Sequence, residues 1–128
     1  GLGRLSNVVL KPAVPFDQLP HLAADADALI MPYRDSPVTR AMQPLKLKEY
    51  LATGKPVIVR NLPAVSEWSD ALDVAETPGR LASLVEERLR TGLPLNQHKA
   101  RERLVHENWS AKARQLESWI EQLLARAR

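Results

Sequence analysis

The stretch QPLKLKEYLATGKPVIV, residues 43–59, combines the pattern of a short helix with that of a buried strand. Pro44 suits the first turn of a helix, because the amide hydrogen that it lacks would have no partner inside the helix. Gly54 is typical of a helix C-terminus, and the β-branched run at residues 56–59 is typical of a strand buried on both faces. The stretch therefore predicts a helix that leads directly into a strand of a parallel sheet.

The same alternation of strands and helices extends in both directions from this stretch. Further buried strands are predicted at residues 7–11 and 25–32 on the N-terminal side and, more weakly, at residues 72–76 on the C-terminal side. Strands that are apolar throughout and alternate with helices predict a Rossmann-like parallel sheet with helices on both faces, so the expected fold class is α/β.

The remaining segments are expected to connect or cover these strands. A helix with the stripe Leu19, Leu22 and Ala23 is predicted first, and a polar loop is predicted at residues 33–43. The rest comprises a turn at 61–68, a helix capped by Thr77 and Pro78 that ends at Gly92, a helix at 96–107, and a last helix capped by Ser110 with the stripe Ala113, Leu116, Ile120, Leu123 and Leu124.

Composition limits the classes of function. The 128 residues suit one domain or part of one, and the absence of cysteine fits a reducing, cytoplasmic setting without thiolate metal sites. The apolar runs are much shorter than the roughly 20 residues that cross a bilayer. The net charge is +3, but basic residues alternate with acidic ones instead of clustering, which disfavours nucleic-acid binding.

Candidate binding residues gather around the opening helix. Ligands of parallel sheets bind beyond the carboxyl ends of the strands, which directs attention to the loops after Met31, Val59 and Glu76. A helix N-terminus beyond such a strand favours an anion, and the Glu49 carboxylate can accept two hydrogen bonds from a diol. The plainer interpretation is that Glu49 and its neighbouring lysines lie on a solvated helix face. The histidines and serines lack the spacing of a metal site or a hydrolase triad, so no catalytic residue is assigned.

Two motifs, ADALIMP and PLKLKEYLATGKPV, together with the closing ENWSAKARQLESWI, give the chain a family resemblance. The sequence resembles the C-terminal, donor-binding half of a GT-B glycosyltransferase of the retaining group 1 (family 4) type. The resemblance implies that residues 1–128 form a partial nucleotide-sugar binding domain, an incomplete C-terminal GT-B domain, with residues 96–128 as a C-terminal helical extension.

The resemblance also implies roles for individual residues. A glutamate at the position of Glu49 binds the ribose hydroxyls of the donor, and backbone atoms at the preceding helix start hold the diphosphate. Those backbone positions correspond here to Gln43, Pro44 and Leu45, with Lys46 as a charge partner. The family commonly has a second glutamate where this chain has Ala41, so Thr39 and Arg40 are expected to help on the sugar side instead.

On this interpretation the chain is a fragment of a cytoplasmic enzyme of polysaccharide biosynthesis, and a peripheral membrane association of the full-length enzyme is compatible with it. The enzyme would transfer a sugar from a nucleotide diphosphate donor to an acceptor, with no metal and no cofactor, since the nucleotide-sugar is a substrate. The expected partners are the donor, an N-terminal acceptor domain outside this chain, and a second copy of the chain through its unpaired edges. The alternative is a non-catalytic Rossmann-type module for nucleotide binding or protein interaction.

Overall fold

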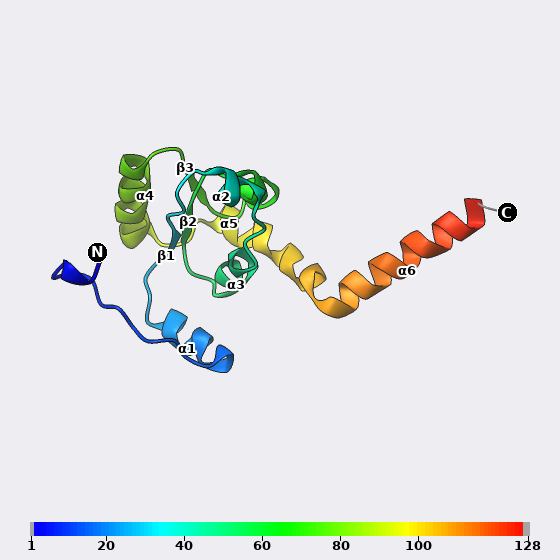
Figure 1. Cartoon of the computed structure of the whole chain (residues 1–128), viewed down its shortest axis with the longest axis horizontal. Coiled ribbons are helices and arrows are strands. Elements are labelled where there is room, and N and C mark those ends of the chain that lie inside the picture. Colours follow the sequence, from blue (N-terminus) through cyan, green and yellow to red (C-terminus); the bar gives the residue numbers. More distant parts are fainter. Residues whose placement is uncertain (1, 127–128) are drawn as a thin grey trace.

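A three-stranded parallel sheet lies at the centre of the structure, a computed structural model that describes residues 2–126. Strands β1 (Leu29–Met31), β2 (Val57–Arg60) and β3 (Asp73–Ala75) lie side by side in the order of the chain (Figure 1). Ile30 is aligned with Ile58 across the first pair, and Val59 with Val74 across the second. The predicted α/β class is confirmed.

Helical segments cover β2 on both faces. On one face Val57 and Val59 pack with residues of α3 (Lys46–Ala52) and of the 3-10 helix η3 (Pro63–Trp68). On the other face Ile58 packs against Leu84 of α4 (Pro78–Thr91). The three strand residues are at most 1% exposed, which explains why the sequence of β2 shows no alternation of polar and apolar residues.

The helix predicted in the opening stretch is present as α3. Leu47 and Leu51 are buried beneath it, one turn apart on the same face. Thr53 caps its C-terminus, and Gly54 follows with a φ of 72°, a backbone conformation that glycine adopts without steric cost. The helix therefore ends where the sequence predicts, and the chain turns directly into β2.

The prediction of a strand at residues 7–11 is wrong. After the 3-10 helix η1 (Leu2–Arg4) the chain runs without regular structure to the 3-10 helix η2 (Phe16–Gln18) and to α1 (Leu19–Ala24). Val9 and Leu10 are 82% and 68% exposed. A β-branched run becomes a strand only when a neighbour takes up its backbone hydrogen bonds, and within residues 2–126 no strand pairs with this segment or with the outer edge of β1.

The strand expected at residues 25–32 is limited to Leu29–Met31, and the expectation that it is buried on both faces is wrong at Ile30. Ile30 in β1 is 44% exposed, although its aligned neighbour Ile58 is fully buried. The reason is the placement of α4, which packs on β2 and β3. That face of β1 consequently lacks the cover that makes a strand uniformly apolar.

The polar loop predicted at residues 33–43 contains a short helix, α2 (Pro37–Ala41). Ser36 caps it: its hydroxyl accepts a hydrogen bond from the Thr39 amide at 3.2 Å, and the Thr39 hydroxyl accepts one from the Ser36 amide at 3.0 Å. This reciprocal arrangement is a capping box, and Pro37 at the first helical position supports it. Local capping thus gives regular structure to a segment that composition alone describes as a loop.

The C-terminal third follows the prediction with two changes. The helix expected at residues 96–107 is α5 (Leu95–Ala100), which tightens into the 3-10 helix η4 (Arg101–Glu107). The last helix, α6 (Trp109–Arg126), is capped by Asn108 and not by Ser110, since the Asn108 side-chain oxygen accepts from the Ala111 amide at 2.8 Å. Figure 1 shows α6 projecting away from the sheet.

Buried polar contacts fix α4 and α5 against β3. Asp73 accepts hydrogen bonds from two nitrogens of Arg88, at 2.6 and 2.7 Å, and from the side-chain nitrogen Nε2 of Gln97 at 3.1 Å. Because a buried carboxylate is stable only when its charge is compensated, this cluster holds both helices in place.

In the part of the chain that the structure describes, no helix combines the length and apolar character needed to cross a membrane.

Candidate functional site

A groove of about 540 Å³ lies between α1 and α3. It contains two of the residues that the sequence singles out, Lys46 and Glu49, both on α3. Its opposite wall is mainly apolar and comes from η2 and α1. The main lining residues are Phe16, Leu19, Pro20, Leu22 and Ala23 on that wall and Lys46, Glu49, Tyr50, Ala52 and Thr53 on α3.

Helical spacing explains why these α3 residues line the groove together. Lys46, Glu49, Tyr50 and Thr53 are separated by three or four residues, the spacing at which side chains share one face of a helix. The adjacent face carries Leu47 and Leu51 into the core. Burial of that apolar face fixes the rotation of α3, and the rotation presents the carboxylate and the ammonium group to the groove.

Lys46 and Glu49 are the charged groups that line the groove. Both are exposed, and within residues 2–126 neither makes an ion pair. The Thr53 hydroxyl, in contrast, donates to the Tyr50 carbonyl at 2.6 Å. Lys55 donates to the Ala24 carbonyl at 2.9 Å and thereby ties the end of α1 to the loop after α3. The groove therefore offers one free anion and one free cation beside an apolar wall.

The backbone positions predicted to hold a diphosphate lie at the start of α3 and do not line the groove. Gln43 and Leu45 are exposed, Leu45 by 83%, and the Pro44 carbonyl accepts the Leu47 amide at 3.0 Å. Lys46 is the residue that joins this turn to the groove, since it follows the turn directly and lines the groove itself.

Thr39 and Arg40, predicted to help on the sugar side, lie on α2 and away from the groove lining. The Thr39 hydroxyl is engaged in the capping box and donates to the Arg34 carbonyl at 2.5 Å. Arg40 forms a two-point pair with Asp35 at 2.8 and 3.2 Å. This hydrogen-bonded pair raises the pKa of Arg40, so its charge is already partnered.

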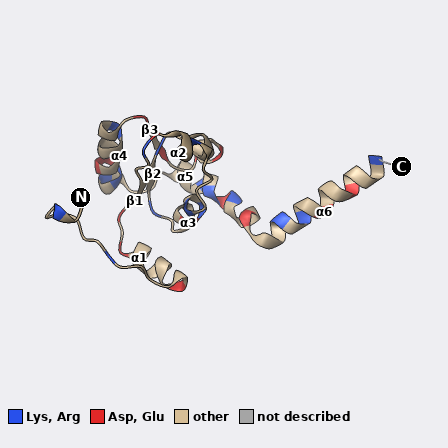
Figure 2. Ribbon diagram, viewed as in Figure 1, with Lys and Arg blue, Asp and Glu red and all other residues tan. Residues whose placement is uncertain are grey.

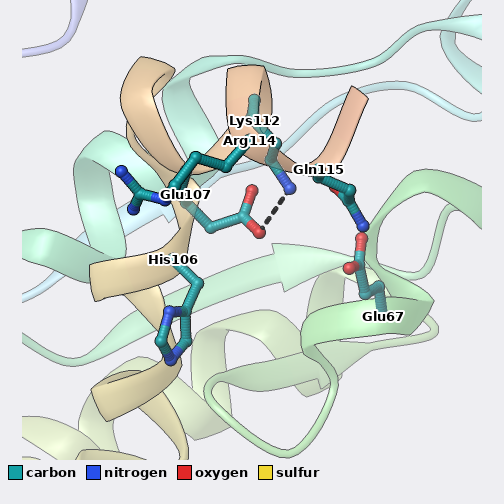
Figure 3. Close-up of a pocket in the computed structure, with 7 residues that line it drawn as sticks. Glu67, His106, Glu107, Lys112, Arg114 and Gln115 are labelled. Atoms are coloured by element: carbon teal, nitrogen blue, oxygen red, sulfur yellow. Dashed lines mark hydrogen bonds and ion pairs between the residues drawn. The ribbon is translucent and has the colours of Figure 1, made fainter. Parts of the chain in front are cut away.

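A second pocket, of about 420 Å³, lies between η3, η4 and the start of α6 (Figure 3). Glu107 accepts hydrogen bonds there from Lys112, at 2.8 Å, and from Lys48. These two hydrogen bonds hold the pKa of Glu107 below its ordinary value, and the bond from Lys112 has the larger effect. Figure 3 shows Gln115 and Glu67 pointing toward each other while the His106 ring points away. The Glu107 carboxylate is thus already paired with cations of the chain.

Sequence reasoning missed the contribution of η2 and α1. Phe16 is 74% exposed and lines the groove, although nothing in its sequence context marks it as a site residue. Tyr50 packs against the core cluster of Leu47 and Leu51 and also lines the groove, so it lies between the two. The helical spacing of Lys46, Glu49, Tyr50 and Thr53 was the signal in the sequence from which this groove-lining face could have been recognised.

Within residues 2–126 no three histidine, aspartate or glutamate side chains converge as metal ligands would.

Comparisons with known proteins give one informative similarity. No family model matches the chain, and no solved structure matches it. Over 64 residues the chain is 45% identical to a Bacillus subtilis (strain 168) protein described as "Putative teichuronic acid biosynthesis glycosyltransferase TuaH". The aligned segment covers 50% of this chain and 16% of that relative, so the chain spans only a small part of the relative's length.

Proposed function

We propose that the chain forms part of the nucleotide-sugar donor-binding domain of a GT-B type glycosyltransferase. The observation that carries the proposal is the identity of 45% over half of the chain with a protein described as a glycosyltransferase. The Rossmann-like sheet supports it at the level of the fold, since nucleotide-binding domains use sheets of this kind, while the groove itself runs along α3 and not along the loops after Met31, Val59 and Glu76.

The groove between α1 and α3 supplies groups that suit a nucleoside diphosphate. In this proposal the Glu49 carboxylate accepts hydrogen bonds from both ribose hydroxyls. Lys46, one helical turn earlier on the same face, neutralises the diphosphate. The exposed Phe16 ring and the leucines of α1 provide apolar surface for the base. Backbone atoms of Gln43, Pro44 and Leu45, directly before Lys46, are proposed to extend the diphosphate end, and Thr39 and Arg40 of α2 are proposed for the sugar side.

The chemistry requires that negative charge be stabilised on the departing group. During transfer, the bond between the sugar's anomeric carbon and the diphosphate oxygen breaks, and an acceptor hydroxyl oxygen forms the new bond to that carbon while its proton passes to the departing diphosphate. The electron pair stays on the diphosphate, so a cation beside it, the role proposed for Lys46, lowers the barrier. The acceptor and the groups that activate it belong to the proposed acceptor domain outside these 128 residues.

Calorimetric titration tests the proposal. Uridine, guanosine and adenosine diphosphates are each compared with the corresponding nucleoside. At least one diphosphate should bind more tightly than its nucleoside, and Lys46→Met should reduce that preference by about tenfold, the effect of losing one charge-assisted hydrogen bond. Lys99→Met, which removes an exposed lysine of α5, is the matched control and should leave the preference unchanged. Equal affinity for every diphosphate and its nucleoside would contradict the proposal and favour an interaction module.

A further inference from the structure

Helix α6 carries a continuous apolar stripe that nothing within residues 2–126 covers. The helix buries none of its residues, and its principal contact is with η4 at its base. An isolated helix of this length is only marginally stable in water, and helices in proteins are stabilised mainly by packing their apolar face. The stripe consists of Leu116 at 55% exposure, Trp119 at 54%, Ile120 at 48%, Leu123 at 64% and Leu124 at 61%.

The stripe is accessible along its length and is distinct from the residues by which α6 contacts the rest of the chain. The residues of α6 that line the pocket beside η3 and η4 are polar or small, namely Ala111, Lys112, Arg114 and Gln115. Figure 3 shows the Lys112 ammonium group directed toward Glu107 and the Gln115 side chain directed toward Glu67. By spacing Ile120 and Leu124 lie toward the opposite side of the helix, whereas Leu116 and Trp119 follow Lys112 and Gln115 by four residues and border that side. All of the apolar residues of the stripe are nevertheless about half exposed or more, so the body of the protein does not block access to them.

The stripe has the spacing of a two-stranded coiled coil. Leu116 and Leu123 are seven residues apart and occupy one core position, d, while Ala113 and Ile120 occupy the other, a. A β-branched residue at a with leucine at d favours a pair of parallel helices. Exposed apolar residues also flank the core, with Trp119 at position g and Leu124 at position e, and they widen the contact surface.

We propose that α6 pairs with α6 of a second copy of this chain as a parallel, in-register coiled coil. In that arrangement each g residue lies beside the e residue of the next heptad in the other helix. Lys112 then lies beside Glu117 of the second copy, and Trp119 beside its Leu124, so both pairs are complementary. Figure 2 shows the acidic and basic residues of α6 separated along the helix by uncharged residues.

Charge disfavours the antiparallel alternative. Antiparallel helices that share this stripe place g beside g and e beside e. Lys112 would then approach Arg126 of the second copy, and Glu117 would approach its own equivalent. Like charges in these positions destabilise the pair. Lys112 pairs with Glu107 in its own chain, and its ammonium group, with three donors, can bridge Glu107 and the second copy's Glu117.

Cysteine cross-linking tests the register, because the chain contains no native cysteine. Leu123→Cys places a thiol in the core, where it meets its own equivalent only if the helices are parallel and in register. Ser118→Cys places a thiol on the outer face of the same helix and is the matched control. Under mild oxidation Leu123→Cys should form a disulfide-linked dimer at least about tenfold faster than Ser118→Cys, since a disulfide requires closely apposed Cβ atoms. Equal rates, or no cross-link, would overturn the proposal.

Sedimentation equilibrium tests the surface independently of the register. The wild-type chain should associate to a dimer as its concentration rises, because two and a half heptads give only weak pairing. Ile120→Glu should raise the dissociation constant by roughly tenfold or more, since it buries a carboxylate in an apolar seam. Ser118→Glu, on the outer face of the helix, should leave the dissociation constant unchanged. A chain that stays monomeric at every concentration, or a dimer indifferent to Ile120→Glu, would overturn the proposal.

Discussion

Arg101 holds three parts of the chain together although it is a charged residue in the core. Its guanidinium donates to the carbonyls of Ala71 at 2.9 Å, Lys55 at 2.7 Å and Leu51 at 3.3 Å. The last belongs to α3, whose C-terminal carbonyls need donors and favour a cation. Burial lowers the pKa of Arg101 to about 10, so the side chain remains charged at neutral pH.

Replacing this cation should therefore destabilise the fold. Arg101→Met keeps the apolar stem but leaves three carbonyls without their donor, and we expect a loss of about 2–4 kcal/mol in the free energy of unfolding. Arg90→Met removes an exposed arginine of α4 and should change it by less than about 0.5 kcal/mol. Urea denaturation followed by circular dichroism measures both, and equal stability of the two variants would show that the Arg101 contacts contribute little.

Individual site residues are less predictable than their elements. The positions of Glu49 and Lys46 on one exposed face follow from helical spacing. Arg101 could not be recognised as buried, because its contacts join residues distant in sequence and its neighbours look like a solvated charged segment. Phe16 likewise lines the groove only because α1 lies beside α3, a tertiary arrangement that local sequence does not encode.

At the scale of elements, Glu107 links α3 to α6. It lies at the end of η4 and accepts hydrogen bonds from Lys48 of α3 and from Lys112 of α6. Its side chain is 14% exposed, so solvent screens these contacts only in part. This carboxylate therefore helps to set the direction in which α6 leaves the body of the protein.

The lowered pKa of Glu107 predicts a specific dependence of stability on pH. The folded state binds its proton less readily than the unfolded state does, so the contribution is fully present above the ordinary pKa of 4.5 and is lost as pH falls through the lower folded value. The difference in unfolding free energy between wild type and Glu107→Gln should be constant near neutrality and shrink below that pH.

Chemical denaturation across a series of pH values measures this difference. Glu102→Gln is the control, because Glu102 is exposed and forms no ion pair within residues 2–126. The difference in unfolding free energy between wild type and Glu102→Gln should not change with pH. A Glu107→Gln difference that stays constant down to pH 3 would contradict the assigned linkage.

Elements with a strong local pattern were predictable, and those that depend on a neighbour were not. The turn from α3 through Gly54 into β2 was predicted because capping, glycine conformation and apolar burial agree there. Residues 7–11 have strand propensity but no pairing partner within the described chain, so propensity alone misled. The helix α2 was missed because its capping box uses threonine where the usual pattern has glutamate or glutamine.

At the scale of the whole molecule, two surfaces stand out beside the compact sheet. The outer edge of β1 is unpaired within residues 2–126, and Ile30 beside it is 44% exposed. The apolar stripe of α6 is the other surface, and it projects well away from the sheet (Figure 1). Surfaces of this kind mark interaction sites in soluble proteins. They fit the proposal that the chain works as one part of a larger assembly.

That proposal predicts binding without transfer. Catalysis of sugar transfer depends on holding donor and acceptor in register, and the proposed groove supplies groups for the donor only. The 128-residue chain should therefore bind a nucleoside diphosphate but form no glycoside from a nucleotide-sugar and a simple acceptor alcohol. Chromatographic analysis of the reaction mixture measures the product. Sustained transfer by this chain alone would contradict the proposal that this chain binds only the donor and that another domain binds the acceptor. Slow hydrolysis of the donor would agree with that proposal.

The central claim is that Glu49 binds the ribose of a nucleotide, and calorimetric titration tests it most directly. The preferred nucleoside diphosphate is compared with its 2′,3′-dideoxy analogue on wild type and on Glu49→Gln. Wild type should favour the ribonucleotide by about 1.5–3 kcal/mol, the range for hydrogen bonds to a charged group, and the variant should lose this discrimination while its stability is unchanged. Equal discrimination by both proteins would place the ribose elsewhere and contradict the account.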